Sequence, residues 1–163
     1  MIIRVKNKES LIFDDFIFRC AVGKKGISSR KKEGDFCTPR GSFNLGTVYY
    51  RSDRISNIKT KLKLIKIKKS MGWCNDPRNK KYNSLIKIKN RFKHEKFHRK
   101  DNKYDIVVVI KYNFKKPIPF NGSAIFLHLT KHYRGTAGCI ALSKNDLLIL
   151  LRLINKKTKI RIF

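Results

Sequence analysis

Short runs of β-forming residues occur along almost the whole chain, and they limit its possible folds more than any other feature does. Asp14 and Asp15 separate two of these runs and predict a hairpin at that point. The run at 104–112 has a continuously apolar centre, which is typical of a strand buried on both faces. The runs cover residues 2–5, 10–13, 16–22, 43–50, 104–112, 123–129 and 158–163.

The segments between these runs are richer in charge and in turn-forming residues. Residues 60–69 (TKLKLIKIKK) alternate lysine with Leu or Ile, which predicts another strand with one cationic and one apolar face. Residues 23–42 and 70–84 are interpreted as loops, and 115–122 (KKPIPFNG) as irregular structure. The second loop carries the chain's single tryptophan.

One helix is predicted, and it follows the last of the four cysteines. Ser143 is a suitable N-cap, Asp146 stands three residues later, and Leu142 and Leu147 can form a hydrophobic staple. The apolar residues after the cap share one face at helical spacing: Leu147, Leu150, Leu151 and Ile154. We find no repeats and no linker long enough to separate two domains, so residues 1–163 are expected to form one mainly β domain with a short helix.

The chain is strongly basic, with 40 Lys+Arg against 11 Asp+Glu and a formal net charge of +29. Such a charge suggests a polyanionic partner, yet the lysines are scattered, and an AT-rich genome also enriches Lys, Ile and Asn. We therefore expect a generally cationic surface that could approach anionic polymers, without a specific nucleic-acid site. The longest apolar runs are too short to cross a bilayer, and residues 1–13 carry charges where an export signal would need an apolar core.

The cysteines stand alone in the sequence. Cys20, Cys37, Cys74 and Cys139 form no CxxC pair, and no histidine lies at ligand spacing from them. The spacing therefore predicts neither a zinc site nor a disulfide framework.

Cys139 differs from the others in its surroundings. It follows the small residues of TAGC, and His128 stands eleven positions before it, in AIFLHL. A nucleophilic cysteine needs a base to take its proton, and backbone N–H groups beside small residues can face an oxyanion. If the two segments lie on neighbouring strands, the side chains can meet; alternatively, both are ordinary core residues.

Residues 128–142 (HLTKHYRGTAGCIAL) resemble the signature of L,D-transpeptidase catalytic domains of the YkuD type. In that family a histidine precedes a Ser/Thr-x-Gly-Cys-Ile/Val segment, which Thr136, Gly138, Cys139 and Ile140 match. Residues 31–46 (KKEGDFCTPRGSFNLG) are similar to the family's G-D-x-x-T-P-x-G-x-F segment. Residues 72–83 and 122–128 resemble segments of a small, compact branch, so the resemblance extends from about residue 20 to the end of the chain.

The resemblance implies a β-sandwich with a mixed sheet and one helix beside the cleft. It also implies acyl transfer on peptidoglycan stem tetrapeptides, with release of D-alanine and formation of a cross-link, no metal and no organic cofactor. Cys139 would be the nucleophile, His128 the general base and acid, and the backbone near Thr136 and Gly138 the oxyanion site. A carboxypeptidase that hydrolyses the same bond and a non-catalytic cationic binding module are the alternatives.

Two positions depart from the family's pattern. Leu129 follows the histidine where many members have Gly, and Ala141 stands where many have Arg. Trp73 and Tyr82 are candidates for lining a substrate groove, and Arg134 and Arg40 are candidates for binding a substrate carboxylate.

We expect a monomer that works in the periplasm or cell envelope, because polymerised stem peptides exist there.

Overall fold

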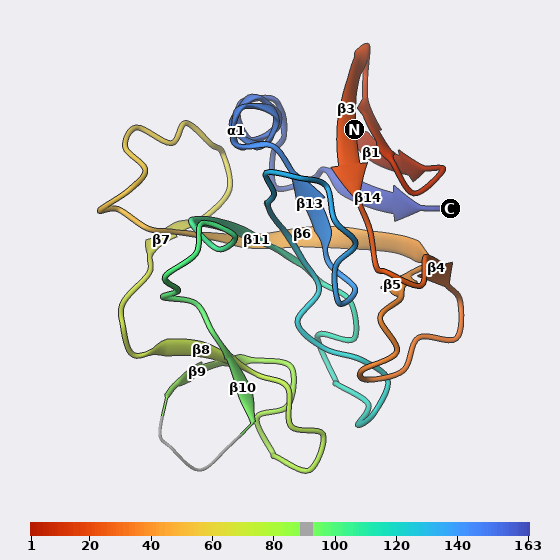
Figure 1. The fold of residues 1–163 in the computed structure, drawn as a ribbon, viewed down its shortest axis with the longest axis vertical. Helices are drawn as coiled ribbons and strands as arrows, with labels where there is room; N and C mark the ends of the chain where they lie inside the picture. Colours follow the sequence, from red (N-terminus) through yellow and green to blue (C-terminus); the bar gives the residue numbers. More distant parts are fainter. Residues whose placement is uncertain (89–92) are drawn as a thin grey trace.

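The protein is described by a computed structural model that covers residues 1–88 and 93–163 (Figure 1). Its elements, in chain order, are β1 (Ile2–Lys6), β2 (Ser10–Phe13), β3 (Phe16–Ala21), β4 (Ile27–Ser28), β5 (Thr38–Pro39), β6 (Gly41–Tyr50), β7 (Leu64–Lys66), β8 (Met71–Cys74), β9 (Leu85–Lys87), β10 (His94–Lys96), β11 (Ile106–Ile110), β12 (Phe126–Leu129), β13 (Ile140–Leu142), α1 (Lys144–Leu153) and β14 (Lys159–Ile162).

Most of the predicted strands are confirmed, and the differences lie in the loops. All five residues of β11 are buried, as its apolar centre predicted. Of the alternating segment 60–69, only Leu64–Lys66 is a strand, because it pairs with β6 over three residues alone. The interpretation of 70–84 as loop was wrong at its start, where β8 pairs with both β9 and β10. The loop 23–42 contains the short pair β4–β5.

The main sheet is mixed and closes on itself. Its order is β11-β12-β13-β3-β2-β1-β14-β6-β7, and β11 also pairs with β6. The long strand β6 makes this closure possible, because residues 41–44 pair with β14 and residues 45–50 pair with β11. The pairs β1–β14, β12–β13 and β6–β7 are parallel and the others antiparallel. The mainly β, sandwich-like architecture with a mixed sheet is confirmed.

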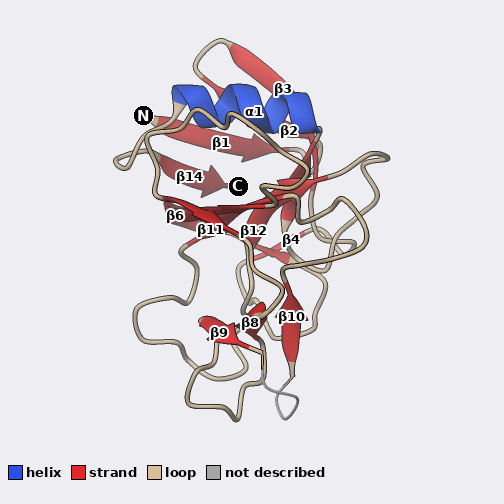
Figure 2. Cartoon of the chain, turned by 90° about the vertical axis from the view of Figure 1, so that its left-hand side faces the viewer, coloured by secondary structure: helices blue, strands red, loops and turns tan. Residues whose placement is uncertain are grey.

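The helix α1 covers one end of the sheet (Figure 2). Ser143 is its N-cap, and the Ser143 side chain accepts a hydrogen bond from the Asp146 N–H, as predicted. Leu147, Leu150 and Leu151 are fully buried in the main core, each contributing about 1.5–3 kcal/mol of burial free energy. Because the helix begins immediately after β13, this packing fixes the chain just beyond Cys139.

A second, aromatic core lies where the three-stranded sheet β10-β8-β9 meets the main sheet. That small sheet lies at the end of the molecule away from α1 (Figures 1 and 2). Trp73 and Phe97 from this part stack at 6.1 Å, and each meets Phe126 of β12 edge-on. Cys139 belongs to the same cluster. The candidate site therefore lies at the junction between the two sheets.

Candidate active site

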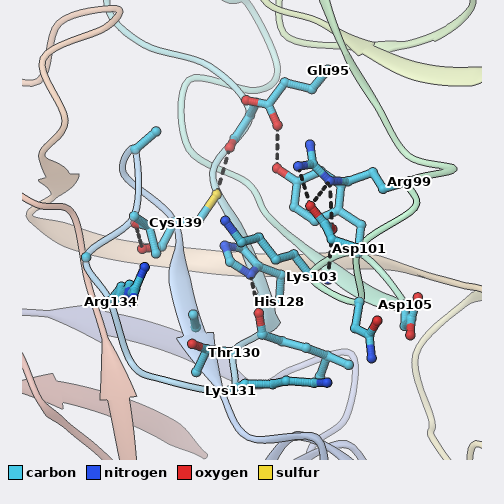
Figure 3. Close-up of a pocket in the computed structure, with 18 of the residues that line it drawn as sticks. Glu95, Arg99, Asp101, Lys103, Asp105, His128, Thr130, Lys131, Arg134 and Cys139 are labelled. Carbon is cyan, nitrogen blue, oxygen red and sulfur yellow. Dashed lines mark hydrogen bonds and ion pairs between the residues drawn. The ribbon is translucent and has the colours of Figure 1, made fainter.

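The parallel pair β12–β13 brings the histidine and cysteine segments together. His128 lies opposite Ala141, and Leu127 lies opposite Ile140. Side chains alternate along a strand, so Cys139, two residues before Ala141, points to the same face as His128. Both side chains line one cavity (Figure 3). The sequence predicted that the two side chains can meet if their segments lie on neighbouring strands. The pairing of β12 with β13 makes these segments neighbours.

The Cys139 thiol is buried and neutral. Its Sγ donates to the Ala124 carbonyl, with 3.2 Å between sulfur and oxygen. Burial raises the pKa of this thiol well above its ordinary value, and the negative charge of Glu95 raises it further. The Phe126 N–H and the Lys31 ammonium act in the opposite direction without reversing the shift. At neutral pH the cysteine therefore needs a base to become a nucleophile.

The His128 imidazole in the same cavity has the protonation state of a base. Burial lowers its pKa to about 4, and the positive charges of Lys103 and Arg99 act in the same direction. Nδ1 lies 2.9 Å from the Leu129 carbonyl oxygen, which can only accept, so Nδ1 carries the proton. Nε2 is then the basic nitrogen. A neutral imidazole with a fixed tautomer is the form that can take a proton from a thiol.

Two threonine hydroxyls hold the turn in front of Cys139. Thr136 Oγ1 accepts from the Gly138 N–H at 3.0 Å and donates to the Cys139 carbonyl at 2.6 Å. Thr38 Oγ1 approaches the same carbonyl at 3.5 Å and accepts from the Gly23 N–H at 2.8 Å. Since the Gly138 N–H is already bonded to Thr136, it does not point to an incoming oxyanion in this state.

Gly138 is the one position in this turn that requires glycine. Its φ is +141°, and a Cβ there would lie 2.8 Å from the carbonyl oxygen of Cys37. A side chain would therefore collide with the loop that carries Cys37 and Thr38. The TAGC turn and the segment 31–46 therefore pack directly against each other.

Lys31 and Asp35 stabilise that loop. The Lys31 ammonium is buried and forms an ion pair with Asp35, which also accepts from the backbone N–H groups of Lys32 and Cys37. Although its partial burial works in the other direction, the hydrogen bonds from Lys31, Lys32 and Cys37 hold the pKa of Asp35 below its ordinary value. Asp35 thus fixes a turn, and Lys31 contributes a cation to the cavity wall.

The cavity has a volume of about 1060 Å³, which is ample for a peptide. Thr136, Arg134 and Ala141 line it together with His128 and Cys139. Basic side chains outnumber acidic ones on its walls: Lys31, Arg54, Lys93, Arg99, Lys103, Lys131, Arg134 and Lys144 against Glu33, Glu95, Asp101 and Asp105. This surface suits a ligand that carries carboxylates.

The other candidate residues lie outside this lining. The Trp73 ring is buried in the aromatic core, and its Nε1 donates to Asn83 Oδ1 at 2.9 Å. The Tyr82 hydroxyl donates to Glu33, which does line the cavity. Arg40 is exposed, and Gly138 is buried. Trp73 and Tyr82 therefore support the walls of the cavity from behind.

Sequence reasoning missed Glu95 and Tyr104. The Tyr104 hydroxyl donates to the Glu95 carboxylate, and the Tyr104 ring lies 5.4 Å from the His128 ring. The distance in sequence between Glu95 and Cys139 hid this relation, since only the folded chain brings β10 to the cavity.

Within residues 1–88 and 93–163, no group of three or more His, Cys, Asp and Glu side chains is arranged to hold a metal ion. The four cysteines are all free thiols. None of the described helices has the length and apolar character to cross a membrane.

Comparison with known families assigns the chain to one family. Residues 3–162 match the L,D-transpeptidase catalytic domain family, YkuD. A search among curated proteins gave no match. The family match covers essentially the whole chain, including His128 and Cys139, and the chain therefore belongs to the YkuD L,D-transpeptidase catalytic domain family.

Proposed function

We propose that the protein is a peptidoglycan L,D-transpeptidase in which Cys139 is the nucleophile and His128 the general base and acid. The observation that supports the proposal is that His128 of β12 and Cys139, the residue before β13, line one peptide-sized cavity. A buried neutral thiol that shares its cavity with a buried neutral imidazole suits a base-assisted attack.

The first half of the proposed reaction forms a thioester. The S–H bond turns from the Ala124 carbonyl towards His128 Nε2, which takes the proton as sulfur attacks the carbonyl carbon of the third stem residue. The bond to the terminal D-alanine breaks, and His128 returns the proton to the leaving amine. Because Nδ1 is held by the Leu129 carbonyl, the ring keeps one tautomer throughout.

In the second half, the amine of another stem peptide attacks the thioester carbonyl. His128 takes the proton that the amine loses and returns it to sulfur, so an amide cross-link forms and the thiol is restored. We assign the oxyanion to the backbone N–H of Cys139, since the Gly138 N–H is bonded to Thr136. Arg134 and Lys131 at the mouth of the cavity would attract substrate carboxylates, whereas Arg40 is too far outside the lining to be assigned this role.

Hydrolysis of the same thioester would make the protein an L,D-carboxypeptidase. The size of the cavity favours the transpeptidase, because about 1060 Å³ can hold a second peptide amine as well as the donor. We further propose that residues 1–163 work as one catalytic domain, as a monomer in the periplasm or cell envelope, without a cofactor. The +29 charge would hold the protein near anionic envelope polymers.

Mass spectrometry of the intact protein tests the proposal. After incubation with a carbapenem or a stem tetrapeptide, the wild-type protein should gain one acyl group, and Cys139→Ala should gain none. Cys20→Ala, Cys37→Ala and Cys74→Ala serve as matched controls and should still be acylated. Acylation of Cys139→Ala would refute Cys139 as the nucleophile, and no acylation of the wild type would leave the cationic binding module as the better interpretation. Fractionation of native cells tests the location.

A further inference from the structure

The loop at 113–122, between β11 and β12, exposes three large apolar side chains at the end of the molecule away from α1 (Figure 1). Phe114, Ile118 and Phe120 are 38%, 58% and 57% exposed, and we call them the apolar tip. With about 200 Å² for a whole side chain of this size, the apolar tip presents on the order of 300 Å² to solvent. An exposed apolar area of this size within one loop is typical of an interaction site.

Hydrogen bonds of one side chain hold this loop in shape. Asn113 Nδ2 donates to the carbonyls of Ile118 at 3.0 Å and Gly122 at 2.9 Å, and Asn113 Oδ1 accepts from the Ile118 N–H at 2.8 Å. Pro117 and Pro119 restrict the backbone between these bonds. The apolar tip is therefore displayed by an ordered loop, and binding through it requires little further ordering.

The charges around the apolar tip are all positive. Lys111, Lys115 and Lys116 are exposed, and residues 111–122 contain no Asp or Glu. The Lys111 ammonium lies 5.7 Å from the centre of the Phe114 ring. The loop thus combines a protruding apolar group with a collar of ammonium groups.

This combination matches the surface of an anionic bilayer. Apolar side chains enter the boundary between headgroups and acyl chains, while neighbouring lysines meet the lipid phosphates. A stable interface with another protein needs about 800 Å² from each partner and is depleted in lysine, so the apolar tip is too small and too basic for one. The other exposed Phe–Ile pair, Phe16 and Ile17, follows Asp14 and Asp15, whose charges would oppose an anionic surface.

We propose that the loop 113–122 docks the protein on anionic lipid bilayers, with the apolar tip inserted and its lysines on the lipid phosphates. The loop leads directly into Ser123 and Ala124, which line the catalytic cavity, and the Phe120 carbonyl accepts from the N–H of Glu33, another lining residue, at 2.7 Å. A bilayer bound at the tip would therefore hold the cavity close to the membrane surface. The proposal goes beyond acyl transfer and does not depend on it.

Co-sedimentation with vesicles tests the docking. One set of vesicles contains phosphatidylglycerol and phosphatidylcholine in equal parts, and the other contains phosphatidylcholine alone. The loop variant is Ile118→Ser with Phe120→Asn, because asparagine suits the φ of +66° at residue 120. Its matched control is Phe16→Asn with Ile17→Ser, which removes the same two kinds of side chain from the β2–β3 hairpin. The melting temperature shows whether each variant is folded.

The apolar and the charged contributions are measured at different salt concentrations. At about 1 M salt, where the Debye length is about 3 Å, the loop variant should bind the mixed vesicles at least about tenfold more weakly than the wild type and the hairpin control. At low salt, Lys115→Gln with Lys116→Gln should lower binding by about tenfold or more. Lys156→Gln with Lys157→Gln, an exposed pair after α1, should change it little.

Fluorescence shows which face meets the lipid. The Trp73 ring stacks on Phe114 with 6.4 Å between the ring centres, and Trp73 is the only tryptophan of the chain. Bromine quenches tryptophan only at short range, so vesicles with brominated acyl chains should quench Trp73 in the wild type. If the loop variant does not fold, this quenching and the lysine variants still decide.

The opposite results refute the docking and leave the acyl transfer untouched. Equal binding of the loop variant and the wild type at high salt, or unquenched Trp73, would show that the apolar tip does not enter the bilayer. A loss of binding in the hairpin control would instead place the contact at the β2–β3 hairpin. If the loop variant loses binding to isolated peptidoglycan and keeps binding to vesicles, the partner of the loop is a glycan surface.

Discussion

The Thr136 hydroxyl makes the two shorter hydrogen bonds of the turn before the nucleophile, so we expect Thr136→Val to weaken both the fold and the reaction. Valine keeps the shape of threonine but loses the bonds to the Gly138 N–H (3.0 Å) and the Cys139 carbonyl (2.6 Å). Each such hydrogen bond contributes about 0.5–1.5 kcal/mol to the free energy of unfolding. Because Gly138 is buried, water cannot fully replace the hydrogen bond that its N–H loses. The free energy of unfolding should fall by about 2 kcal/mol.

Urea unfolding and the rate of Cys139 acylation measure the two effects. Thr136→Ser is the matched control, because it keeps the hydroxyl and should stay within about 0.5 kcal/mol of the wild type. We expect Thr136→Val to acylate at least about tenfold more slowly, since about 1.4 kcal/mol of lost positioning has that effect. The contact of Thr38 with the Cys139 carbonyl at 3.5 Å is too long to compensate.

The same variant distinguishes two oxyanion sites. If the Gly138 N–H stabilises the oxyanion, Thr136→Val releases this donor, and acylation should be unchanged or faster despite the loss of stability. If the turn matters only as a support for the Cys139 backbone, both quantities fall together. A variant with unchanged stability and an unchanged rate would refute the role given to the hydroxyl.

Three further predictions concern the same region and the surface. Gly138→Ala should lower the melting temperature and the acylation rate, because its Cβ would lie 2.8 Å from the Cys37 carbonyl at a φ of +141°; a wild-type melting temperature would contradict this. His128→Ala should lower acylation by at least about 100-fold in single-turnover kinetics; a smaller loss would indicate another base. In shift assays nucleic-acid binding should be weak, non-selective and steeply salt-dependent, and tight sequence-selective binding would contradict it.

The sequence identified the strands and the helix well, because each depends on local signals. The continuous apolar centre of β11 and the Ser143 cap with its staple are patterns that neighbouring residues determine alone. The ends of the alternating segment 60–69 were not predictable in the same way. A lysine-rich strand forms only where a partner strand is available. Here β6 pairs with only three residues of the segment.

The site was predicted in part for a similar reason. Cys139 and His128 were recognisable because their chemistry and their motif are local. Glu95 and Lys31 act on the thiol through the folded cavity, and they lie 44 and 108 residues away in sequence. Trp73 illustrates the opposite case: its position in a polar segment suggested a groove, yet pairing of β8 places it in a buried aromatic core.

The buried imidazole makes a final prediction about pH. Burial lowers the His128 pKa to about 4, whereas a histidine in the unfolded chain titrates near 6.5. Between these values the unfolded chain binds a proton that the folded protein does not, so stability falls as the pH is lowered. The loss reaches about 3 kcal/mol near pH 4, levels off below that pH, and is nearly absent above pH 7.

His128→Asn removes this titration, so urea unfolding of the two proteins between pH 4.5 and 7.5 isolates it from the carboxylates, which titrate in both. The wild type should lose more stability towards low pH than the variant does. The acylation rate of the wild type should be nearly constant from pH 5 to 8, because the base is already neutral and the thiol stays protonated. A rate that rises with a midpoint near 6.5, together with equal pH dependences of stability, would mean that the imidazole is solvated and charged at rest, and the neutral-pair mechanism would have to be abandoned.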